Sequence, residues 1–399
     1  MNYYPNDMPN KDNPLRASDV RERNQKIVLR LIRERGDKGL SQSEAVAATG
    51  LRAPTMLRIF SGLEEEGYIE PLPPSSSEDE GKERKGRPPV SFAVRADVLY
   101  SLGVEFWVDR VSLGLFDFRG SRVSSHVVEL ERGTDAASAA DIVSGGVRSL
   151  LESRGIENGR VLGLGLGAPG QVNVRTRRIA YYSRIPGMRD FPLAEILEER
   201  LGIPVTIHNN CSVIALSEYR YGNVGATDSL FMFLLRSGVN GAFIDGGRIY
   251  LTSEGTTIET GHIPIDYRGK LCSCGSRGCL EAYIADLASP DLEAGRCLFE
   301  SLAPSLEAGD PESEKTLREA AKYLASASRS VQRLFNPQSY LVVTASAAVS
   351  EALAEYVREN LQRFPSGFDP SSIIFEGREY DPGLAQRGAA DLVLDAFLS

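Results

Sequence analysis

Polar and apolar positions near the start of the chain follow a helical spacing. In SDVRERNQKIVLRLIRERG, residues 18–36, the apolar residues Val20, Ile27 and Leu31 recur as they would on one side of a helix. The next stretch, SQSEAVAATG, has Ser41 and Glu44 at the spacing of a capping box. Gly50 then supplies the turn. The pattern predicts a long helix followed by a short one.

A third helix follows in RAPTMLRIFSGLEEEGYIE, with a proline in its first turn and Gly67 at its end. A long helix followed by two helices joined at a glycine is typical of a helix-turn-helix, although a generic three-helix domain would show the same pattern. In the helix-turn-helix interpretation, Arg52, Thr55 and Arg58 of the third helix are placed to meet DNA. Arg52 and Thr55 lie in the first turn, which usually contacts base edges.

Residues 68–94, YIEPLPPSSSEDEGKERKGRPPVSFAV, predict a strand, a loop and a second strand, which is the layout of a wing. The basic end of the loop includes Lys85 and Arg87, which could enter an A/T-rich minor groove. A solvated linker of mixed charge is the alternative for SSSEDE. We predict a winged helix-turn-helix over residues 18–97, after a polar leader at 1–17.

From residue 98 the pattern changes to that of an α/β body. VLYSLGVEFWVDRVSLGLFDFRGSRVSSHVVEL predicts three successive strands with a turn at Arg119–Gly120. Helical stretches then alternate with apolar strands such as RVLGLGLGAP, SLFMFLLRSG and SYLVVTAS. This alternation predicts an α/β body in two lobes over residues 98–399.

Composition is that of a globular protein, with 42% hydrophobic and 25% charged residues. The net charge of −9 is uneven, because residues 1–95 hold 16 basic and 15 acidic side chains. The remainder is therefore acidic, which permits a DNA-binding head on an acidic body. No apolar run has the length of a membrane span, and the N-terminus lacks a signal-peptide core. We therefore expect a cytoplasmic protein without a membrane partner.

Three of the five cysteines and one of the three histidines fall in HIPIDYRGKLCSCGSRGC, residues 262–279. One imidazole and three thiolates, from His262, Cys272, Cys274 and Cys279, form a set that commonly binds structural zinc. Four protein ligands leave no position for a reactive water, so the expected metal is structural rather than hydrolytic. The alternative, cysteines packed as small core residues, suits a polar glycine-rich loop poorly.

The order of several motifs resembles that of the ROK family of sugar kinases and transcriptional repressors, in particular its sugar-responsive regulators. These motifs are GLGAPGQV, HNNCSVIALSE, ETGH, CSCGSRGCLE and NPQSYLVVTAS. The resemblance implies an actin-like, ribonuclease H-like body of two lobes behind the winged helix-turn-helix. It also implies an effector site that includes Arg184, Asn209, Asn210, Glu259, His262 and Glu281.

Compared with the kinases of that family, the residues for phosphoryl transfer are missing. Asn210 stands where the family has a catalytic aspartate, and a carboxamide cannot accept a proton at neutral pH. At the first phosphate turn, where the family's kinases carry an Asp-x-Gly-Gly-Thr type sequence, this chain reads EFWVD. Its bulky Phe106 and Trp107 prevent close backbone approach to a phosphate. Later turns read RSGVNG and TAS. We therefore predict no catalytic residues and no kinase activity, with a kinase of unusual nucleotide loops as the alternative.

The family's sugar-binding residues are only partly retained, because Arg184 stands where an asparagine is expected. Arg184 would either pair with a phosphate or carboxylate of the ligand or face solvent. The prediction is a repressor of carbohydrate-metabolism genes that binds a sugar or sugar derivative. As a homodimer, or a higher oligomer, it would bind a pseudo-palindromic operator. A vestigial cleft, or control by a protein partner, remains an alternative.

Overall fold

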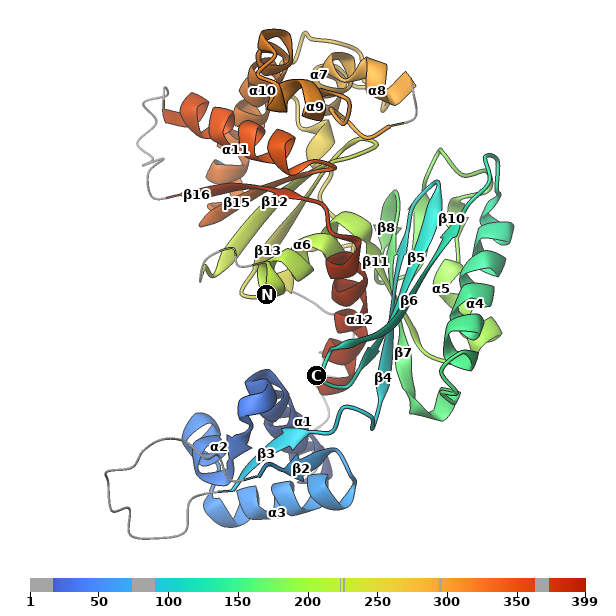
Figure 1. Cartoon of the computed structure of the whole chain (residues 1–399), viewed down its shortest axis with the longest axis vertical. Coiled ribbons are helices and arrows are strands. Elements are labelled where there is room, and N and C mark those ends of the chain that lie inside the picture. The colour runs from blue at the N-terminus through green and yellow to red at the C-terminus, as the bar shows by residue number, and fades with distance from the viewer. Residues whose placement is uncertain (1–16, 74–89, 223, 225–226, 294–295, 363–372) are drawn as a thin grey trace.

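The computed structural model describes residues 17–73, 90–222, 224, 227–293, 296–362 and 373–399. Figure 1 shows a small N-terminal domain at one end and two α/β lobes stacked beyond it. Lys85 and Arg87 fall outside the described residues. Among those that are described, no helix is long and apolar enough to cross a membrane.

The N-terminal domain has the predicted three helices and a small antiparallel sheet of order β1-β3-β2. The elements are α1 (Ala17–Arg35), β1 (Leu40–Ser41), α2 (Gln42–Thr49), α3 (Ala53–Glu65), β2 (Ile69–Pro71) and β3 (Ser91–Val94). The capping box is confirmed, because the Glu44 amide donates to Ser41 Oγ and the Ser41 amide donates to the Glu44 carboxylate. Gly50 ends α2 in the left-handed conformation, as predicted.

The buried face of α1 differs from the predicted one. Val28, Leu29 and Ile32 are buried, whereas Val20 and Ile27 are exposed. The helix packs against β3 and the C-terminal helix α12 (Pro382–Leu398), and the sequence of α1 alone does not reveal these neighbours.

The first lobe is a mixed sheet of strand order β11-β7-β4-β5-β6. Its opening strands confirm the predicted run of three with a turn at Arg119–Gly120. The strands are β4 (Tyr100–Phe106), β5 (Arg110–Asp117), β6 (Arg122–Glu129), β7 (Val161–Ala168) and β11 (Val205–Asn209). Helices α4 (Ala136–Glu152) and α5 (Leu193–Leu201) share a core with this sheet. A small sheet of β8 (Gln171–Asn173), β9 (Arg178–Tyr181) and β10 (Arg189–Phe191) extends it.

The second lobe has a sheet of order β14-β13-β12-β15-β16. The strands are β12 (Ser229–Leu235), β13 (Val239–Asp245), β14 (Arg248–Ile249), β15 (Ser339–Thr344) and β16 (Ile374–Glu379). Its core contains residues of α7 (Leu280–Leu287), α10 (Pro311–Phe335) and α11 (Ala347–Gln362), and the short helices α8 (Ser289–Glu293) and α9 (Leu302–Glu307) lie nearby. The predicted two-lobed α/β fold is confirmed.

Two helices cross between the lobes. Helix α6 (Asn210–Tyr221) follows β11 of the first lobe but packs on β13 of the second. Helix α12 does the reverse: it follows β16 of the second lobe but packs on β4 and β7 of the first. The backbone of α12 lies directly on the sheet, because a Cβ at Gly103 or Gly165 would stand 1.8 or 1.7 Å from a carbonyl oxygen of α12. The glycines of VLGLGLGA therefore permit close helix–sheet packing.

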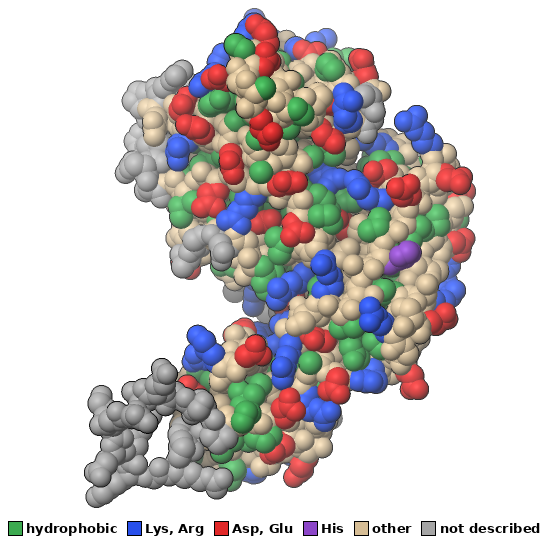
Figure 2. Space-filling view, viewed as in Figure 1, with side chains coloured by type: hydrophobic (Ala, Val, Ile, Leu, Met, Phe, Trp, Pro, Cys, Tyr) green, Lys and Arg blue, Asp and Glu red, His purple; other side chains and the backbone are tan. Residues whose placement is uncertain are grey.

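The N-terminal domain shares its core with the body. Phe118, from the turn after β5, and Leu394 and Leu398 of α12 belong to the same buried cluster as Val28 and Ile32. Figure 2 shows a deep hollow between the N-terminal domain and the second lobe. The N-terminal domain is thus attached through α12 and the first lobe.

Candidate functional site

The predicted metal ligands come together in one loop between a 3-10 turn, η3 (Thr260–His262), and α7. The ligand atoms of His262, Cys272, Cys274 and Cys279 all lie within 4.8 Å of one another. Gly278 makes this fold of the loop possible, because its φ is +75° and a Cβ there would stand 1.6 Å from the Asp266 carbonyl oxygen. Isolated bridges between Pro264 and Cys279 and between Leu271 and Arg277 hold the loop closed.

Two of the distances between the donor atoms match the edges of a tetrahedral zinc site. Ordinary Zn–S and Zn–N bonds give edges of about 3.8 Å between two sulfurs and about 3.6 Å between sulfur and nitrogen. Cys274 Sγ lies 3.7 Å from Cys279 Sγ, and Cys272 Sγ lies 3.6 Å from His262 Nδ1. The Ser276 backbone amide lowers the pKa of the Cys274 thiol to about 7, whereas burial raises that of Cys279 to about 12. A bound zinc ion would keep both as thiolates.

Two carboxylates flank this loop, as the sequence predicted. Glu259 immediately precedes η3, and Glu281 lies in the first turn of α7. Burial raises the pKa of Glu259, and the nearby Glu281 raises it further, while His262 and a hydrogen bond from Gln171 lower it. Glu281 Oε2 accepts the Val239 amide at 3.0 Å. Gln171 belongs to the first lobe and was not singled out from the sequence, although it ends the motif GLGAPGQ.

Asn209 and Asn210 lie at the junction of β11 and α6. Asn209 caps α6, because its Oδ1 accepts the Cys211 amide at 2.9 Å, and its Nδ2 donates to the Gly170 carbonyl at 2.7 Å. The carboxamide of Asn209 is therefore already bonded at both ends to backbone. Asn210 Oδ1 also accepts the Cys211 amide, at 2.8 Å. The adjoining His208 is fully buried, and burial lowers the pKa of its imidazole to about 4.

Arg184 reaches across from the first lobe to the second. Its Nη2 donates to the Ser237 carbonyl at 2.6 Å, although the side chain is exposed. Ser237 lies in the turn after β12. The Arg184 guanidinium thus contacts the opposite lobe while its side chain is exposed, and both expectations for Arg184 stay open.

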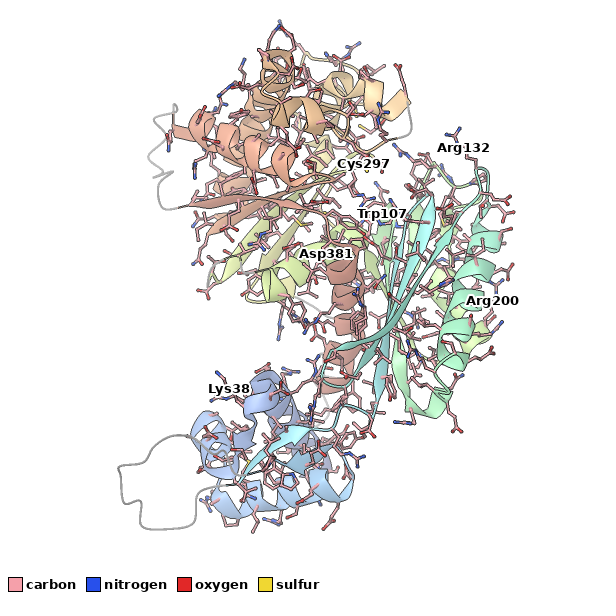
Figure 3. All side chains as sticks on the ribbon, viewed as in Figure 1. Lys38, Trp107, Arg132, Arg200, Cys297 and Asp381 are labelled. Carbon is pink, nitrogen blue, oxygen red and sulfur yellow. The ribbon has the colours of Figure 1, made fainter. Side chains whose placement is uncertain are left out.

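The turns predicted to have lost phosphate binding are filled by protein side chains. Trp107, between β4 and β5, and Arg236, directly after β12, are both buried. The Arg236 guanidinium carbon lies 4.4 Å from the Trp107 ring centroid and 4.0 Å from that of Tyr380. The Tyr380 amide donates to the carbonyl of Thr344, at the third of these turns, over 2.9 Å. Figure 3 places Trp107 where the lobes meet.

Of the predicted DNA-contacting residues, the three that the structure describes lie at the start of α3. Arg52 occupies the position directly before α3 and is exposed. Arg58, in the second turn of the helix, is also exposed, while Thr55 is half-buried. Leu57, which was not predicted, has 53% of its surface exposed on this same helix. The beginning of α3 therefore presents two guanidinium groups and one apolar side chain to solvent.

Two five-stranded sheets, two crossing helices and a Cys₃His loop near their junction define a two-lobed, actin-like α/β body. The ROK family profile matches residues 101–396, and the chain belongs to the ROK family.

Relatives within this family differ in how much of the chain they match. A xylose repressor of Caldicellulosiruptor bescii is 22% identical over 85% of this chain and 87% of its own. A glucokinase of Streptomyces coelicolor is 24% identical over 67% of this chain and 88% of its own. Among solved structures, a ROK family transcriptional regulator, described as a homologue of the Escherichia coli protein MLC, superposes with a TM-score of 0.77 at 18% identity. That superposition covers 95% of this chain and 98% of the regulator, so the shared fold includes the N-terminal domain.

Proposed function

We propose that this protein is a DNA-binding transcriptional repressor of carbohydrate-metabolism genes, controlled by a sugar or sugar derivative bound between its lobes. The observation that carries the proposal is the combination of the N-terminal domain with the ROK body. The xylose repressor matches 85% of the chain, whereas the glucokinase matches 67%. A sugar kinase has no need of such a domain, but a repressor does.

The start of α3 would enter the major groove. Arg52 lies directly before its first turn and Thr55 within that turn, and both would contact base edges, while Arg58 would contact either a base or a phosphate. Lys85 and Arg87 would add minor-groove or phosphate contacts from the wing. A homodimer, alone or within a higher oligomer, would place two such helices on the half-sites of a pseudo-palindromic operator.

The effector site would take its polar groups from both lobes. Glu259, Glu281 and His262 belong to the second lobe, and Gln171 and Asn210 lie on the other side of the junction. Several carboxylates and carboxamides close together could form hydrogen bonds with the many hydroxyl groups of a sugar. Arg184 would give up its hydrogen bond to the Ser237 carbonyl and bind an anionic group of the ligand instead. A ligand with different affinity for two lobe arrangements would shift the balance between them.

The four cysteine and histidine ligands would hold a structural zinc ion. A bound zinc ion would cross-link the loop. With four protein ligands it would have no open coordination position for catalysis. His262 Nδ1 faces the sulfurs, and Glu259 and Glu281 lie just before and just after the metal loop. The loop's rigidity would thus set the positions of both carboxylates.

We also propose that the protein is not a kinase. Asn210 offers no general base, and Trp107 and Arg236 fill the turns that would have to admit phosphates. The runner-up function, a sugar kinase with altered nucleotide loops, requires that these side chains move aside. ATP consumption in the presence of any sugar would favour it.

The test begins with the full-length zinc-loaded protein and a library of random double-stranded DNA. We expect selection of a pseudo-palindromic sequence. The selected duplex is then titrated in the presence of single sugars, sugar phosphates and sugar acids, and one of these compounds should weaken the complex. Failure to enrich any sequence would overturn the proposed function. An enriched sequence with no response to small ligands would favour control by a protein partner.

A further inference from the structure

Four side chains from widely separated parts of the sequence form one cluster between the lobes. Glu105 and Trp107 come from the first lobe, and Arg236 and Tyr380 come from the second. The Tyr380 hydroxyl donates to the Glu105 carboxylate. The Trp107 and Tyr380 rings meet edge to face, with centroids 6.2 Å apart, and the guanidinium of Arg236 lies against both. We call these four residues the inter-lobe cluster.

Separating the side chains of the inter-lobe cluster would cost free energy, because its polar groups are buried. Glu105 is 1% exposed, and Trp107 and Arg236 are each 6% exposed. A buried carboxyl group and a buried guanidinium are each costly to leave without their partners. Moving one lobe away from the other would leave Glu105 without the Tyr380 hydroxyl and Arg236 without the Trp107 ring. The cluster therefore favours the lobe arrangement seen here.

Helix α12 begins immediately after the cluster. Asp381 follows Tyr380 and caps the helix, its carboxylate accepting the Gly383 amide at 2.7 Å. Figure 3 places Asp381 at the end of α12 near the lobe junction. Because α12 lies with its backbone directly on β4 and β7, it has little freedom to bend along its length. A change in the position of Tyr380 would shift the helix as a unit.

The other end of α12 is bound into the N-terminal domain. Leu394 and Leu398 lie in the core of that domain, and the Leu398 carbonyl accepts a hydrogen bond from Arg30 of α1 at 2.5 Å. Near the same end, Asp391 contacts Arg33 of α1. One helix thus connects the inter-lobe cluster to α1 of the domain proposed to bind DNA.

We propose that the inter-lobe cluster is a latch that fixes the relative position of the two lobes and, through α12, that of the N-terminal domain. An effector would change the orientation of the N-terminal domain by opening or tightening the latch. The link to DNA affinity rests on the proposed function. The mechanical link from the latch to α1 does not.

The experiment compares the full-length protein with three single variants and, for the unfolding temperature, one double variant. Tyr380→Phe removes the hydroxyl that binds Glu105 but keeps the ring against Arg236, and Glu105→Gln replaces the carboxyl group at nearly constant volume. The matched control is Tyr340→Phe, since the buried Tyr340 hydroxyl donates to Gln332 at 2.9 Å entirely within the second lobe. Each variant is measured by hydrogen–deuterium exchange, read by mass spectrometry without DNA or ligand.

We expect Tyr380→Phe and Glu105→Gln to speed exchange about tenfold at the end of β4, at the start of α12 and in α1. Tyr340→Phe should speed exchange only around β15 and the end of α10. The double variant Glu105→Gln/Tyr380→Phe should shift the unfolding temperature by less than the two single shifts together, because both remove the same contact. Unchanged exchange in α1 for both latch variants, or additive temperature shifts, would overturn the proposal.

Titration with the selected DNA, together with the exchange data, distinguishes failure of the latch from failure of the proposed DNA-binding function. If no sequence is enriched but exchange in α1 responds to Tyr380→Phe, the latch stands and the DNA-binding function fails. If the DNA binds but α1 does not respond, the latch fails and the function stands. With both correct, Tyr380→Phe changes the DNA dissociation constant several-fold, while Tyr340→Phe leaves it unchanged.

Discussion

The guanidinium of Arg33 in α1 lies 3.8 Å from the carboxylate of Asp391 in α12, joining the N-terminal domain to the body. Asp391 is 2% exposed and also accepts the Tyr221 hydroxyl at 2.6 Å and contacts Arg220 at 3.2 Å. Three elements, α1, α6 and α12, therefore converge on one buried carboxylate. The fixed position of the N-terminal domain relative to the lobes depends strongly on this group.

Replacing Asp391 by asparagine should destabilise the protein by about 3 kcal/mol, because it leaves two guanidinium groups without their shared buried counter-charge. Asp395→Asn is the matched control, since Asp395 pairs with Arg220 at 2.6 Å but is 41% exposed. We expect the control to cost about 1 kcal/mol or less. Urea unfolding of the full chain measures both variants. Equal losses in the two would show that Asp391 has no special role in joining these elements.

The metal site predicts a stoichiometry of one zinc ion per chain. Cys274→Ser should abolish tight zinc binding, because it removes one of four ligands from a closed site. Cys297→Ser is the control, since Cys297 lies outside the ligand group. Metal content is measured by atomic emission after dialysis. A full equivalent of zinc in Cys274→Ser would contradict the assignment.

Stripping the metal from the unmodified protein should loosen residues 262–279 and weaken the response to the effector before the whole chain unfolds. The chelated protein should therefore still show its helical circular dichroism at room temperature while its ligand-induced shift in unfolding temperature is lost. Complete unfolding on chelation would mean that the metal supports more of the fold than its loop.

The raised pKa of the Glu105 carboxyl leads us to expect that the stability of the protein depends on pH. Burial raises the pKa of its carboxyl to about 7 from an ordinary value of 4.5, even though the Tyr380 hydroxyl, Arg236, Trp107 and Arg110 all lower it. Between these values the native protein keeps a proton that the unfolded chain has lost. The free energy of unfolding therefore falls as pH rises from about 4.5 to about 7, at most by about 1.4 kcal/mol per pH unit for this one proton.

Glu105→Gln should make that fall shallower by the contribution of one proton. Glu218, whose pKa burial also raises to about 7, would still contribute a second proton in the same range. Unfolding free energies at a series of pH values from 4.5 to 7.5 give the slope for each variant. If Glu105→Gln and the unmodified protein have the same slope, the Glu105 carboxyl is ionised throughout this range.

Much of the architecture was predictable because its signals are local. The Ser41–Glu44 capping box and the turn at Gly120 depend on residues a few positions apart. The Cys₃His group was predictable for the same reason, since three of its four ligands lie within eight residues. Local spacing was sufficient wherever one loop or one turn contains the whole feature.

The inter-lobe cluster and the buried face of α1 depend instead on distant parts of the chain. Trp107, Arg236 and Tyr380 carry no pattern that pairs them, because three different strands bring them together. The prediction for α1 placed Val20 and Ile27 on its apolar face, but α12 and β3 cover Val28, Leu29 and Ile32 instead. The apolar residues within 27–32 point to several sides of the helix, and its tertiary neighbours decide which of them are buried.

If the start of α3 binds DNA, removing an arginine there should lower the affinity for DNA. Arg58→Ala should weaken binding to the selected duplex, and if Arg58 meets a phosphate it should reduce the salt slope by about one. Arg87→Ala tests the wing in the same way. Arg154→Ala, an exposed arginine after α4 in the first lobe, controls for the change in net charge. Fluorescence anisotropy at several salt concentrations supplies the constants, and a variant that matches the control would remove its residue from the interface.

Two glycine substitutions should change stability in opposite directions. Gly165→Ala puts a Cβ 1.7 Å from the Ala389 carbonyl oxygen, so α12 must move away from β7. A methyl group at Gly145, inside α4, meets nothing within 4 Å. Gly145→Ala should therefore stabilise the protein by about 0.5–1 kcal/mol through its helix preference, whereas Gly165→Ala should cost more than that. Thermal unfolding gives both signs. Tolerance of Gly165→Ala would mean that α12 can shift on the sheet at little cost, and a latch acting through a rigid α12 would then lose its physical basis.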